Sequence, residues 1–241
     1  MLKRTPSLTE QAKSHIKQLI LDGAFVDGKI PSETELAIDL GVSRTTIRDA
    51  LSRLENEGIV YRKQGAGTFV NEAGLQIKSR LDEIWSYEEM LAAHGYTPST
   101  RILEVTTQHA TPDMAADLNL TESDNLIIVR KLFLADNQPV ILANNYIPAH
   151  LLTEPYQPTD FVEPIYRYLW ENGRSHLNYY LSEIIPIIAS ADMAKTLHIQ
   201  PQTPLLSLRE IGYNDDNQPV LCANSHFRDD LLRFRLIRRK I

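Results

Sequence analysis

The stretch PSETELAIDLGVSRTTIRDAL, residues 31–51, contains two short helical patterns that decide the fold of the N-terminal part. Ser32 and Glu35 have the Ser-x-x-Glu spacing of a capping box, which predicts that a helix begins after Ser32. Gly41 follows the last apolar residue of this helix, and glycine is typical of a helix end. A second helix is predicted to begin at Ser43. Two short helices joined by a turn that contains glycine form a helix-turn-helix.

The segments on both sides of this motif extend it. Apolar residues at helical spacing predict another helix upstream, over residues 8–22. Downstream, two strand-like segments, 59–63 and 67–70, are joined around Gln64-Gly65-Ala66 and form a predicted hairpin. A hairpin after a helix-turn-helix is typical of the wing of a winged helix. We therefore expect a winged helix-turn-helix domain over residues 1–70.

Polar and basic side chains gather at the N-terminal end of the second helix of the pair. This is the end that a recognition helix inserts into the major groove of DNA. Arg44 and Arg48 are one helical turn apart, so both can reach guanine edges or phosphates. The predicted DNA-binding residues lie in both helices of the motif and in the wing: Ser32, Glu33, Thr34, Ser43, Arg44, Thr45, Thr46, Arg48, Arg53, Gln64, Gly65, Ala66, Gly67 and Thr68.

Charge is unevenly distributed along the 241 residues of the chain. The formal net charge is −6, but residues 1–70 hold 10 Lys and Arg against 9 Asp and Glu. This asymmetry points to the N-terminal part as the one that contacts nucleic acid. A single cysteine, Cys222, excludes a disulfide framework, and no apolar run is long enough to cross a membrane. We expect a soluble protein of the cytoplasm.

The remaining residues contain an internal repeat. Asp136-Asn-Gln-Pro-Val140 recurs as Asp216-Asn-Gln-Pro-Val220, and Ala-Asn follows each copy. Each copy is predicted to form a strand, a short helix and two further strands. The strands are expected over 100–108, 126–135 and 140–147, and again over 179–188, 205–213 and 220–227. Duplication predicts one mostly antiparallel sheet with pseudo-twofold symmetry and with helices over 81–94 and 165–172 on one face.

The N-terminal motifs resemble the DNA-binding domain of GntR-type bacterial regulators. The resemblance covers residues 8–70 and rests on Pro31-Ser32-Glu33-x-Glu35-Leu36, Gly41-Val42-Ser43-Arg44-x-Thr46-Ile47-Arg48 and Gly65-x-Gly67-Thr68-Phe69-Val70. It implies sequence-specific binding to double-stranded DNA. Thr34 stands where many members have an arginine that contacts DNA, and Ala66 stands where the wing often has a basic residue. These two departures bear on base preference.

The C-terminal part resembles the effector-sensing UTRA domain of HutC-type GntR regulators, which shares its fold with chorismate lyase. The resemblance rests on LADNQPV (134–140), NNYIP (144–148) and ANSHFRDD (223–230). It implies a repressor that binds a pseudo-palindromic operator as a homodimer, and a small-molecule effector that changes operator affinity. The expected fold class is α+β, with a winged helix-turn-helix domain at 1–70, a linker at 71–80 and an antiparallel effector-binding and dimerisation domain at 81–241.

The resemblance also suggests which residues hold the effector. Relatives that sense sugar phosphates have Arg-x-Arg and a Glu at positions occupied here by Lys131, Phe133 and Ala143, which weakens the case for a phosphorylated sugar. Lys131 and Arg228 could still bind one carboxylate or phosphate together, which favours an acidic effector. The predicted effector-binding residues are Lys131, Phe133, Asn144, Tyr166, Glu183, Ser225 and Arg228.

Two other roles remain open for the C-terminal domain at this point. It could serve dimerisation alone, in which case no small molecule would change operator affinity, or it could retain a lyase-like or hydrolase activity. Against an enzyme, the sequence has no Gly-x-Ser-x-Gly, His-Glu-x-x-His or phosphate-binding loop. Its seven histidines show no ligand-like spacing, so neither a metal site nor a cofactor is predicted.

Overall fold

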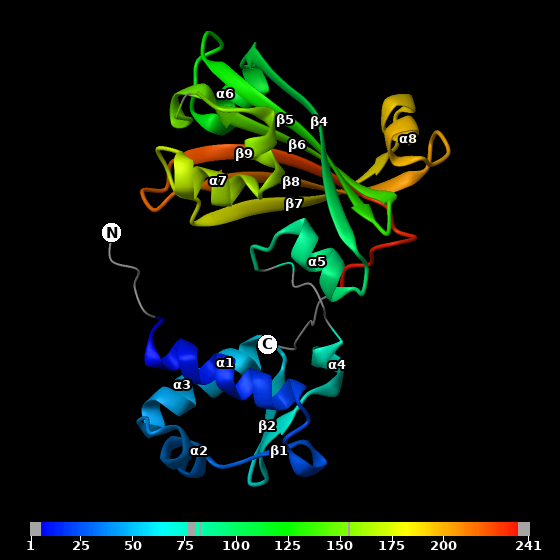
Figure 1. The fold of residues 1–241 in the computed structure, drawn as a ribbon. Coiled ribbons are helices and arrows are strands. Elements are labelled where there is room, and N and C mark those ends of the chain that lie inside the picture. Colours follow the sequence, from blue (N-terminus) through cyan, green and yellow to red (C-terminus); the bar gives the residue numbers. More distant parts are fainter. Residues whose placement is uncertain (1–5, 77–80, 82, 154, 236–241) are drawn as a thin grey trace. The chain divides into compact units, whose positions relative to one another are not determined.

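A helix-turn-helix and a small wing sheet form the N-terminal unit of the chain. The computed structural model describes residues 6–76, 81, 83–153 and 155–235 (Figure 1). The first of its two compact units ends before Leu81. This unit contains α1 (Leu8–Leu21), η1 (Val26–Gly28), β1 (Lys29–Ile30), α2 (Glu33–Leu40), α3 (Arg44–Asn56), β2 (Val60–Lys63), β3 (Gly67–Val70) and α4 (Glu72–Leu75).

Serine side chains fix where the two helices of the motif begin. The hydroxyl of Ser32 accepts the backbone N–H of Glu35, and the Glu35 carboxylate accepts the N–H of Ser32, which confirms the predicted capping box. The hydroxyl of Ser43 caps α3 by accepting the N–H of Thr46. Gly41 ends α2 with a φ of 65°, a left-handed conformation that glycine adopts at little cost.

The wing has three strands, whereas a two-stranded hairpin was expected. β3 pairs antiparallel with β2 and, on its other side, with β1. β1 was not expected because two residues are too few to show an alternating pattern. The three helices and this sheet enclose one apolar core, in which Ile16, Ile47 and Leu54 are fully buried.

The segment expected to be a linker begins with a short helix. α4 occupies part of the predicted 71–80 linker and packs against the N-terminal unit. A Cβ on Gly74 would lie 1.9 Å from the carbonyl oxygen of Gly58. The side-chain amide of Asn71 donates to the same oxygen at 2.8 Å. Residues 77–80 of the predicted linker lie outside the described residues.

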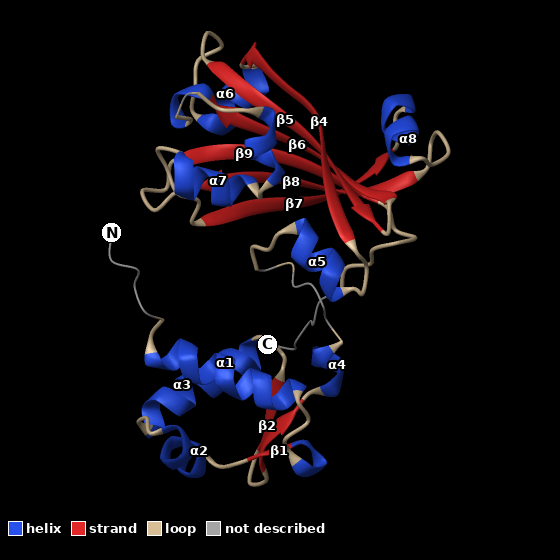
Figure 2. Ribbon diagram, viewed as in Figure 1, coloured by secondary structure: helices blue, strands red, loops and turns tan. Residues whose placement is uncertain are grey.

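The second unit, Leu81–Phe234, is built on a six-stranded antiparallel sheet (Figure 2). Its strands lie in the order β4-β5-β6-β9-β8-β7. The elements are α5 (Tyr87–Ala93), β4 (Pro98–His109), α6 (Pro112–Leu118), β5 (Asn125–Ala135), β6 (Gln138–Pro148), η2 (Ala149–Leu151), η3 (Pro158–Val162), α7 (Ile165–Asn172), β7 (Tyr179–Ile188), α8 (Ala191–Leu197), β8 (Pro204–Tyr213) and β9 (Pro219–Phe227). Strand, helix, strand and strand thus follow one another twice; that a sequence duplication produced this order stays a prediction.

Helices cover both faces of the sheet, although helices on only one face were expected. On the first, which we call the α5/α7 face, α5 packs with Phe133 and α7 packs with Val129. On the second, the α6/α8 face, α6 packs with Cys222 and α8 packs with Leu142. The expectation was wrong because the short helices within each repeat also need an apolar surface, and they find it on the second face.

The two helices of the α5/α7 face differ in how well the sequence predicted them. The helix expected over 81–94 begins only at Tyr87, because the side chain of Ser86 accepts the backbone N–H of Glu89 and caps it there. α7 has the expected bounds, 165–172. No helix among the described residues is both long enough and apolar enough to cross a membrane.

The short helices of the α6/α8 face are exchanged between the two halves of the sheet. In the chain α6 lies between β4 and β5, yet it makes its main contacts with β9. Likewise α8 lies between β7 and β8 and contacts β6. Because β6 and β9 pair at the centre of the sheet, each helix reaches across the centre onto the half that does not contain it.

Candidate functional site

The N-terminal end of α3 presents an exposed polar surface. Arg44, Thr45 and Arg48 are exposed there, whereas Ile47 is fully buried in the core. Arg44 forms no ion pair with any residue that the structure describes. The hydroxyls of Ser43 and Thr46 are hydrogen-bonded at 2.8 Å, so the residue that caps α3 also orients the side chain of Thr46. Among the described residues, the helix end thus presents Arg44 without an ion-pair partner, beside short hydroxyl side chains.

Glu33 of α2 holds the guanidinium of Arg48. The Nε and Nη2 atoms of Arg48 donate to Oε2 of Glu33 at 3.1 and 3.0 Å. The two side chains are 55% and 26% exposed, so solvent reaches the pair. The contact orients Arg48 and also places a negative charge beside it. A phosphate that binds Arg48 must therefore displace the Glu33 carboxylate or share the Arg48 guanidinium with it.

Arg53, also predicted to contact DNA, lies on the side of α3 that faces α1. Its Nη1 atom pairs with Glu10 of α1 at 3.2 Å. The pair links α3 to α1 and separates Arg53 from the surface that carries Arg44 and Arg48. Arg53 is half-exposed, so its predicted contact with the DNA backbone stays a prediction.

The wing places two further lysines beside its turn. The predicted wing segment, residues 64–68, turns through Gly65 and Gly67, whose φ angles are 74° and 115°. Lys63 at the start of the turn is exposed, as is Lys29 of β1. A Cβ on Gly67 would lie 3.6 Å from Cε of Lys29, which places this lysine against the wing. Lys29 was not predicted because its proximity depends on the strand β1.

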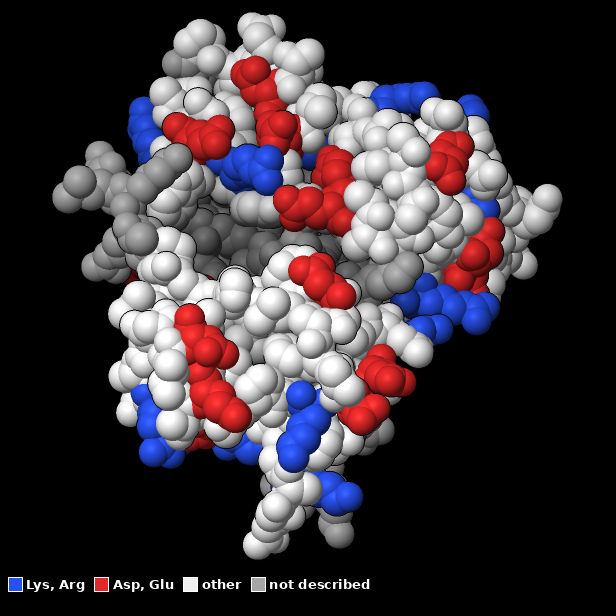
Figure 3. All heavy atoms as spheres, turned by 60° about the horizontal axis from the view of Figure 1, so that its bottom comes forward, with Lys and Arg blue, Asp and Glu red and all other residues white. Residues whose placement is uncertain are grey.

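Charges of both signs are interspersed on the face shown in Figure 3. The described Lys and Arg side chains visible there alternate with Asp and Glu and form no large patch of one sign. A large basic patch would attract DNA regardless of sequence. Where charges of both signs are interspersed, we expect DNA binding to depend instead on where the individual basic side chains lie.

Lys131 of β5 is a buried lysine on the α5/α7 face of the second unit. Its side chain is 2% exposed, and its Nζ donates to the carbonyls of Val162 and Glu163 at 3.0 and 2.9 Å. The ammonium also lies 5.2 Å from the ring centre of Phe133. Burial lowers the pKa of Lys131 to about 8, and the carboxylates of Glu88 and Glu163 oppose this shift.

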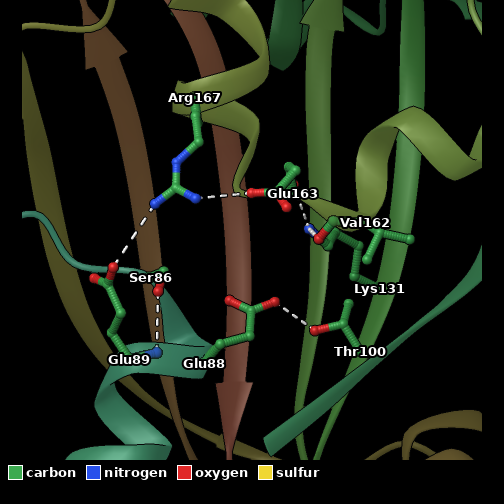
Figure 4. A network of polar contacts seen from close by, with 8 residues as sticks. All are labelled: Ser86, Glu88, Glu89, Thr100, Lys131, Val162, Glu163 and Arg167. Atoms are coloured by element: carbon green, nitrogen blue, oxygen red, sulfur yellow. Dashed lines mark hydrogen bonds and ion pairs between the residues drawn. The ribbon is translucent and has the colours of Figure 1, made fainter.

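Polar contacts connect α5, the segment before α7 and the sheet (Figure 4). Arg167 pairs with Glu163 at 2.9 Å and with Glu89 at 3.7 Å. Glu88 accepts a hydrogen bond from Thr100 of β4 through Oε1. Its Oε2 is buried and has no hydrogen-bond partner among the described residues. In Figure 4 the Glu88 carboxylate points from α5 toward the strands of the sheet.

Further polar groups, of which Ser225 is buried and Tyr87 and Glu210 are half-buried, lie on the same face. The hydroxyls of Tyr87 and Ser225 are hydrogen-bonded, and the ring centre of Tyr87 lies 4.9 Å from that of Phe133. Glu210 of β8 accepts a hydrogen bond from Ser182 at 2.6 Å. Burial raises the pKa of Glu210, although the Ser182 hydroxyl acts in the opposite direction. Tyr180 of β7 lies close enough to Glu210 and Tyr87 for their charges to act with burial in raising its pKa. We call this group the Lys131 cluster and define it by Tyr87, Glu88, Lys131, Tyr180, Glu210 and Ser225.

The predicted effector residues Lys131, Phe133, Tyr166 and Ser225 share the α5/α7 face. Tyr166 lies on α7, is half-buried and is hydrogen-bonded to Arg167. Tyr87, Glu88, Tyr180 and Glu210 were not predicted. A signal existed for Glu210, because it follows Leu206 and Leu208 at the two-residue period of a strand face.

Asn144 and Glu183 lie on the α6/α8 face, in a polar row that crosses all six strands. Backbone pairing places these residues side by side in the order Glu104, Arg130, Asn144, Asn224, Arg209 and Glu183. Arg209 pairs with Glu183 at 2.9 Å and with Asp117 of α6, and Arg130 pairs with Asp192 of α8. The arginines thus attach both short helices to the sheet.

The structure also separates Arg228 from Lys131. The guanidinium of Arg228 pairs with Asp230 at 2.6 Å and donates to the carbonyls of Pro139 and Leu197 at 2.8 and 3.2 Å. Leu197 is the last residue of α8, which covers the opposite face from Lys131. The two cations are not arranged to bind one anion together, so the basis for expecting an acidic effector is lost.

Comparisons with known proteins identify relatives of both units. Residues 8–70 match the profile described as bacterial regulatory proteins, gntR family, and residues 93–233 match the UTRA domain. The chain is 30% identical over 227 residues to the HTH-type transcriptional repressor NagR of Bacillus subtilis (strain 168), covering 94% of this chain and 91% of that protein. It is 29% identical over 218 residues to the histidine utilization repressor of Pseudomonas putida, covering 90% and 86%.

A solved structure shows the same fold. YydK from Bacillus subtilis subsp. subtilis str. 168 matches with a TM-score of 0.76 at 18% identity, over 97% of this chain and 100% of that one. The effector domain of PhnF from Mycobacterium smegmatis matches with a TM-score of 0.58 at 18% identity, over 64% of this chain and 95% of that one. At these sequence identities, the two matches show a shared fold and nothing about function.

Proposed function

Because the chain belongs to the GntR family of bacterial regulatory proteins and carries a UTRA domain, we propose that this DNA-binding transcriptional regulator is a repressor that acts as a homodimer. The exposed N-terminal end of α3, with Arg44 and Arg48 one turn apart, is the observation that carries the proposal. We assign DNA binding to residues 1–70, the linker to 71–80, and effector binding and dimerisation to 81–241.

The recognition helix α3 enters the major groove with Arg44, Thr46 and Arg48 at the base edges or phosphates. Two copies of α3 in a homodimer read two half-sites about one helical turn apart, so the operator is pseudo-palindromic. Lys29 and Lys63 beside the wing turn neutralise backbone phosphates. Phosphate contacts supply most of the affinity, and the contacts of α3 to bases supply specificity.

The Lys131 cluster is the effector site in this proposal. Its support is the burial of Lys131, and of the Oε2 atom of the half-buried Glu88, on the α5/α7 face. α5 supplies Tyr87 and Glu88 to the cluster and is the first described helix after the linker. A ligand that bonds to Glu88 changes the contacts of α5, and it thereby favours dimers whose recognition helices no longer match the half-sites.

The proposal also covers the kind of genes that the protein regulates and its location in the cell. One relative is named for histidine utilization, and we extend this to control of genes for the use of a small nutrient. We propose a cytoplasmic location, where both DNA and effector are present, and a function that involves no catalysis.

Operator binding and its release can be tested together. An operator would be selected from random duplexes by the full-length chain, and metabolites that raise the melting temperature would be added in a fluorescence anisotropy titration. A ligand at 100 times its Kd adds about 2.7 kcal/mol to the free energy of unfolding. We expect two chains per operator and at least one ligand that weakens binding about tenfold or more.

Three outcomes would contradict the proposal. Failure to select any preferred duplex would contradict sequence-specific binding. Stabilising ligands that leave operator affinity unchanged would favour a C-terminal domain that serves only dimerisation. Chemical conversion of a stabilising ligand would indicate an enzyme.

A further inference from the structure

Two hydrogen-bonding positions in the Lys131 cluster are unused by the described residues. An ammonium group has three N–H donors, and Lys131 directs two of them to the carbonyls of Val162 and Glu163. Glu88 uses one carboxylate oxygen for Thr100, while its Oε2 is buried without a partner among the described residues. A buried carboxylate oxygen without a partner is unfavourable, so a ligand that donates to it would be stabilised.

The charge of the cluster is unsuited to an anionic ligand. Lys131 is the one cation among the residues that define it, and the carboxylates that act on Lys131 are those of Glu88 and Glu163. Glu210 lies on β8, three strands away from β5. Glu163 also lies near Lys131 but is paired with Arg167. A phosphate or carboxylate group placed against Lys131 would therefore also be repelled by the Glu88 carboxylate, whose Oε2 is buried.

The strands beside Lys131 add no second cation. Backbone pairing places Ile102 of β4 on one side of Lys131 and Ala143 of β6 on the other. Ser225 of β9 follows Ala143, and Leu208 of β8 follows Ser225. A fork of two cations, the usual arrangement for a phosphate or carboxylate, is thus not formed by these described strand neighbours.

We propose, on the basis of the effector site proposed above, that the cluster binds a polyhydroxylated ligand without a phosphate or carboxylate group. A hydroxyl accepts and donates at once, so one hydroxyl can accept from Lys131 and donate to Glu88. Glu210 accepts from a second hydroxyl or from an amino group. The ring of Phe133, next to Lys131 on the same face, offers an apolar surface for the C–H groups of such a ligand.

Matched probes can test the ligand class by isothermal titration calorimetry on the full-length chain. The panel would contain free hexoses, hexosamines, pentoses, disaccharides and alditols, each beside its phosphate ester, with inorganic phosphate as a further probe. We expect at least one free member to bind, and its phosphate ester to bind at least about tenfold more weakly because the ester is repelled by the carboxylates.

Variants show whether binding occurs at the cluster. Glu88→Gln keeps the size of the side chain but removes its charge, and it is expected to weaken the binding probe about 10- to 100-fold. Glu210→Gln is a second variant with the same expected direction. Glu122→Gln removes a carboxylate from an exposed turn and serves as the matched control with unchanged affinity.

The results test the ligand class separately from the proposal that ligand binding changes operator affinity, which we call the switch. The ligand class is wrong if a phosphate ester binds as tightly as its free counterpart, if Glu88→Gln and Glu210→Gln leave affinity unchanged, or if no member of the panel binds. A free probe that binds without changing operator affinity supports the ligand class and contradicts the switch. Operator release by a phosphorylated or acidic metabolite through this cluster supports the switch and contradicts the ligand class.

Discussion

Asn144 of β6 lies directly opposite Asn224 of β9, at the centre of the six-stranded sheet. Both follow the same Asp-Asn-Gln-Pro-Val motif, so residues at equivalent places in the two repeats meet at this point. An arginine and then a glutamate follow on each side, Arg130 with Glu104 and Arg209 with Glu183. The sheet therefore has a local pseudo-twofold relationship between its two halves.

Arg48→Ala is expected to weaken operator binding by about 1–3 kcal/mol, because Arg48 is placed for a base edge or a phosphate. Fluorescence anisotropy at moderate salt would measure the change. Arg101→Ala, which removes an exposed arginine from β4 in the other unit, is the matched control. Operator affinity that is equal in Arg48→Ala and in the unsubstituted chain would remove Arg48 from the DNA-binding surface.

Glu33→Gln is expected to reduce discrimination between the operator and random DNA. Glu33 orients Arg48 and lowers the local positive charge, so its loss should strengthen binding to random duplexes more than binding to the operator. Asp39→Asn makes the same charge change at an exposed position of α2 that does not contact Arg48. The ratio of operator affinity to random-duplex affinity, measured at several salt concentrations, should fall only in Glu33→Gln. An equal fall in both variants would indicate a general charge effect.

The lowered pKa of Lys131 predicts how the free energy of unfolding depends on pH. This pKa is about 8 in the folded chain, against an ordinary value of 10.5. Between these values the unfolded chain binds more protons, so Lys131 makes the folded state more stable as pH rises through this window. From about pH 7.5 to about pH 9.5, the unfolding free energy should rise by about 2 kcal/mol relative to Lys131→Met.

Urea denaturation of the full-length chain and of Lys131→Met at both pH values would measure this difference. The subtraction removes the contribution of groups that titrate in both proteins. Parallel pH profiles of the two proteins would show that Lys131 titrates normally in the folded state.

Arg209→Met is expected to lower the free energy of unfolding by about 1–2 kcal/mol, because Arg209 attaches Asp117 of α6 to the sheet. Glu183 is 57% exposed and only one of two partners of Arg209, so Glu183→Gln should cost less than about 1 kcal/mol. Urea denaturation measures both costs. Calorimetry with a ligand of the Lys131 cluster should find unchanged affinity in Glu183→Gln. A large loss of ligand affinity would instead indicate that Glu183 is part of the effector site.

Most elements of the fold could be predicted because their sequence signals are local. The capping box at Ser32, the glycine at the end of α2 and the turn residues between strands each act within a few residues. The start of α5 was wrong because apolar residues such as Ile84 continue the helical pattern upstream, and the cap at Ser86 outweighs them. The second helical layer could not be predicted, because much of the surface that α6 needs comes from β9, far away in sequence.

The effector site could be predicted only in part, because strand pairing decides which residues share a face. Lys131 and Phe133 are two residues apart on β5 and so share a face by strand geometry. Asn144 lies opposite Arg130, and Ala143 lies opposite Lys131. A difference of one residue in register thus moves Asn144 to the α6/α8 face, and no local pattern in the sequence reports that register.

The exchange of α6 and α8 between the halves of the sheet has a consequence for folding during synthesis. The main partner strand of α6, β9, is synthesised after the other five described strands of this sheet. Until β9 emerges, apolar residues of α6 such as Leu118 lack the part of their native surface that Cys222 supplies, and contacts this distant in sequence slow folding. Neither half can close its core alone, so a prematurely ended chain is expected to aggregate rather than persist as a smaller stable domain.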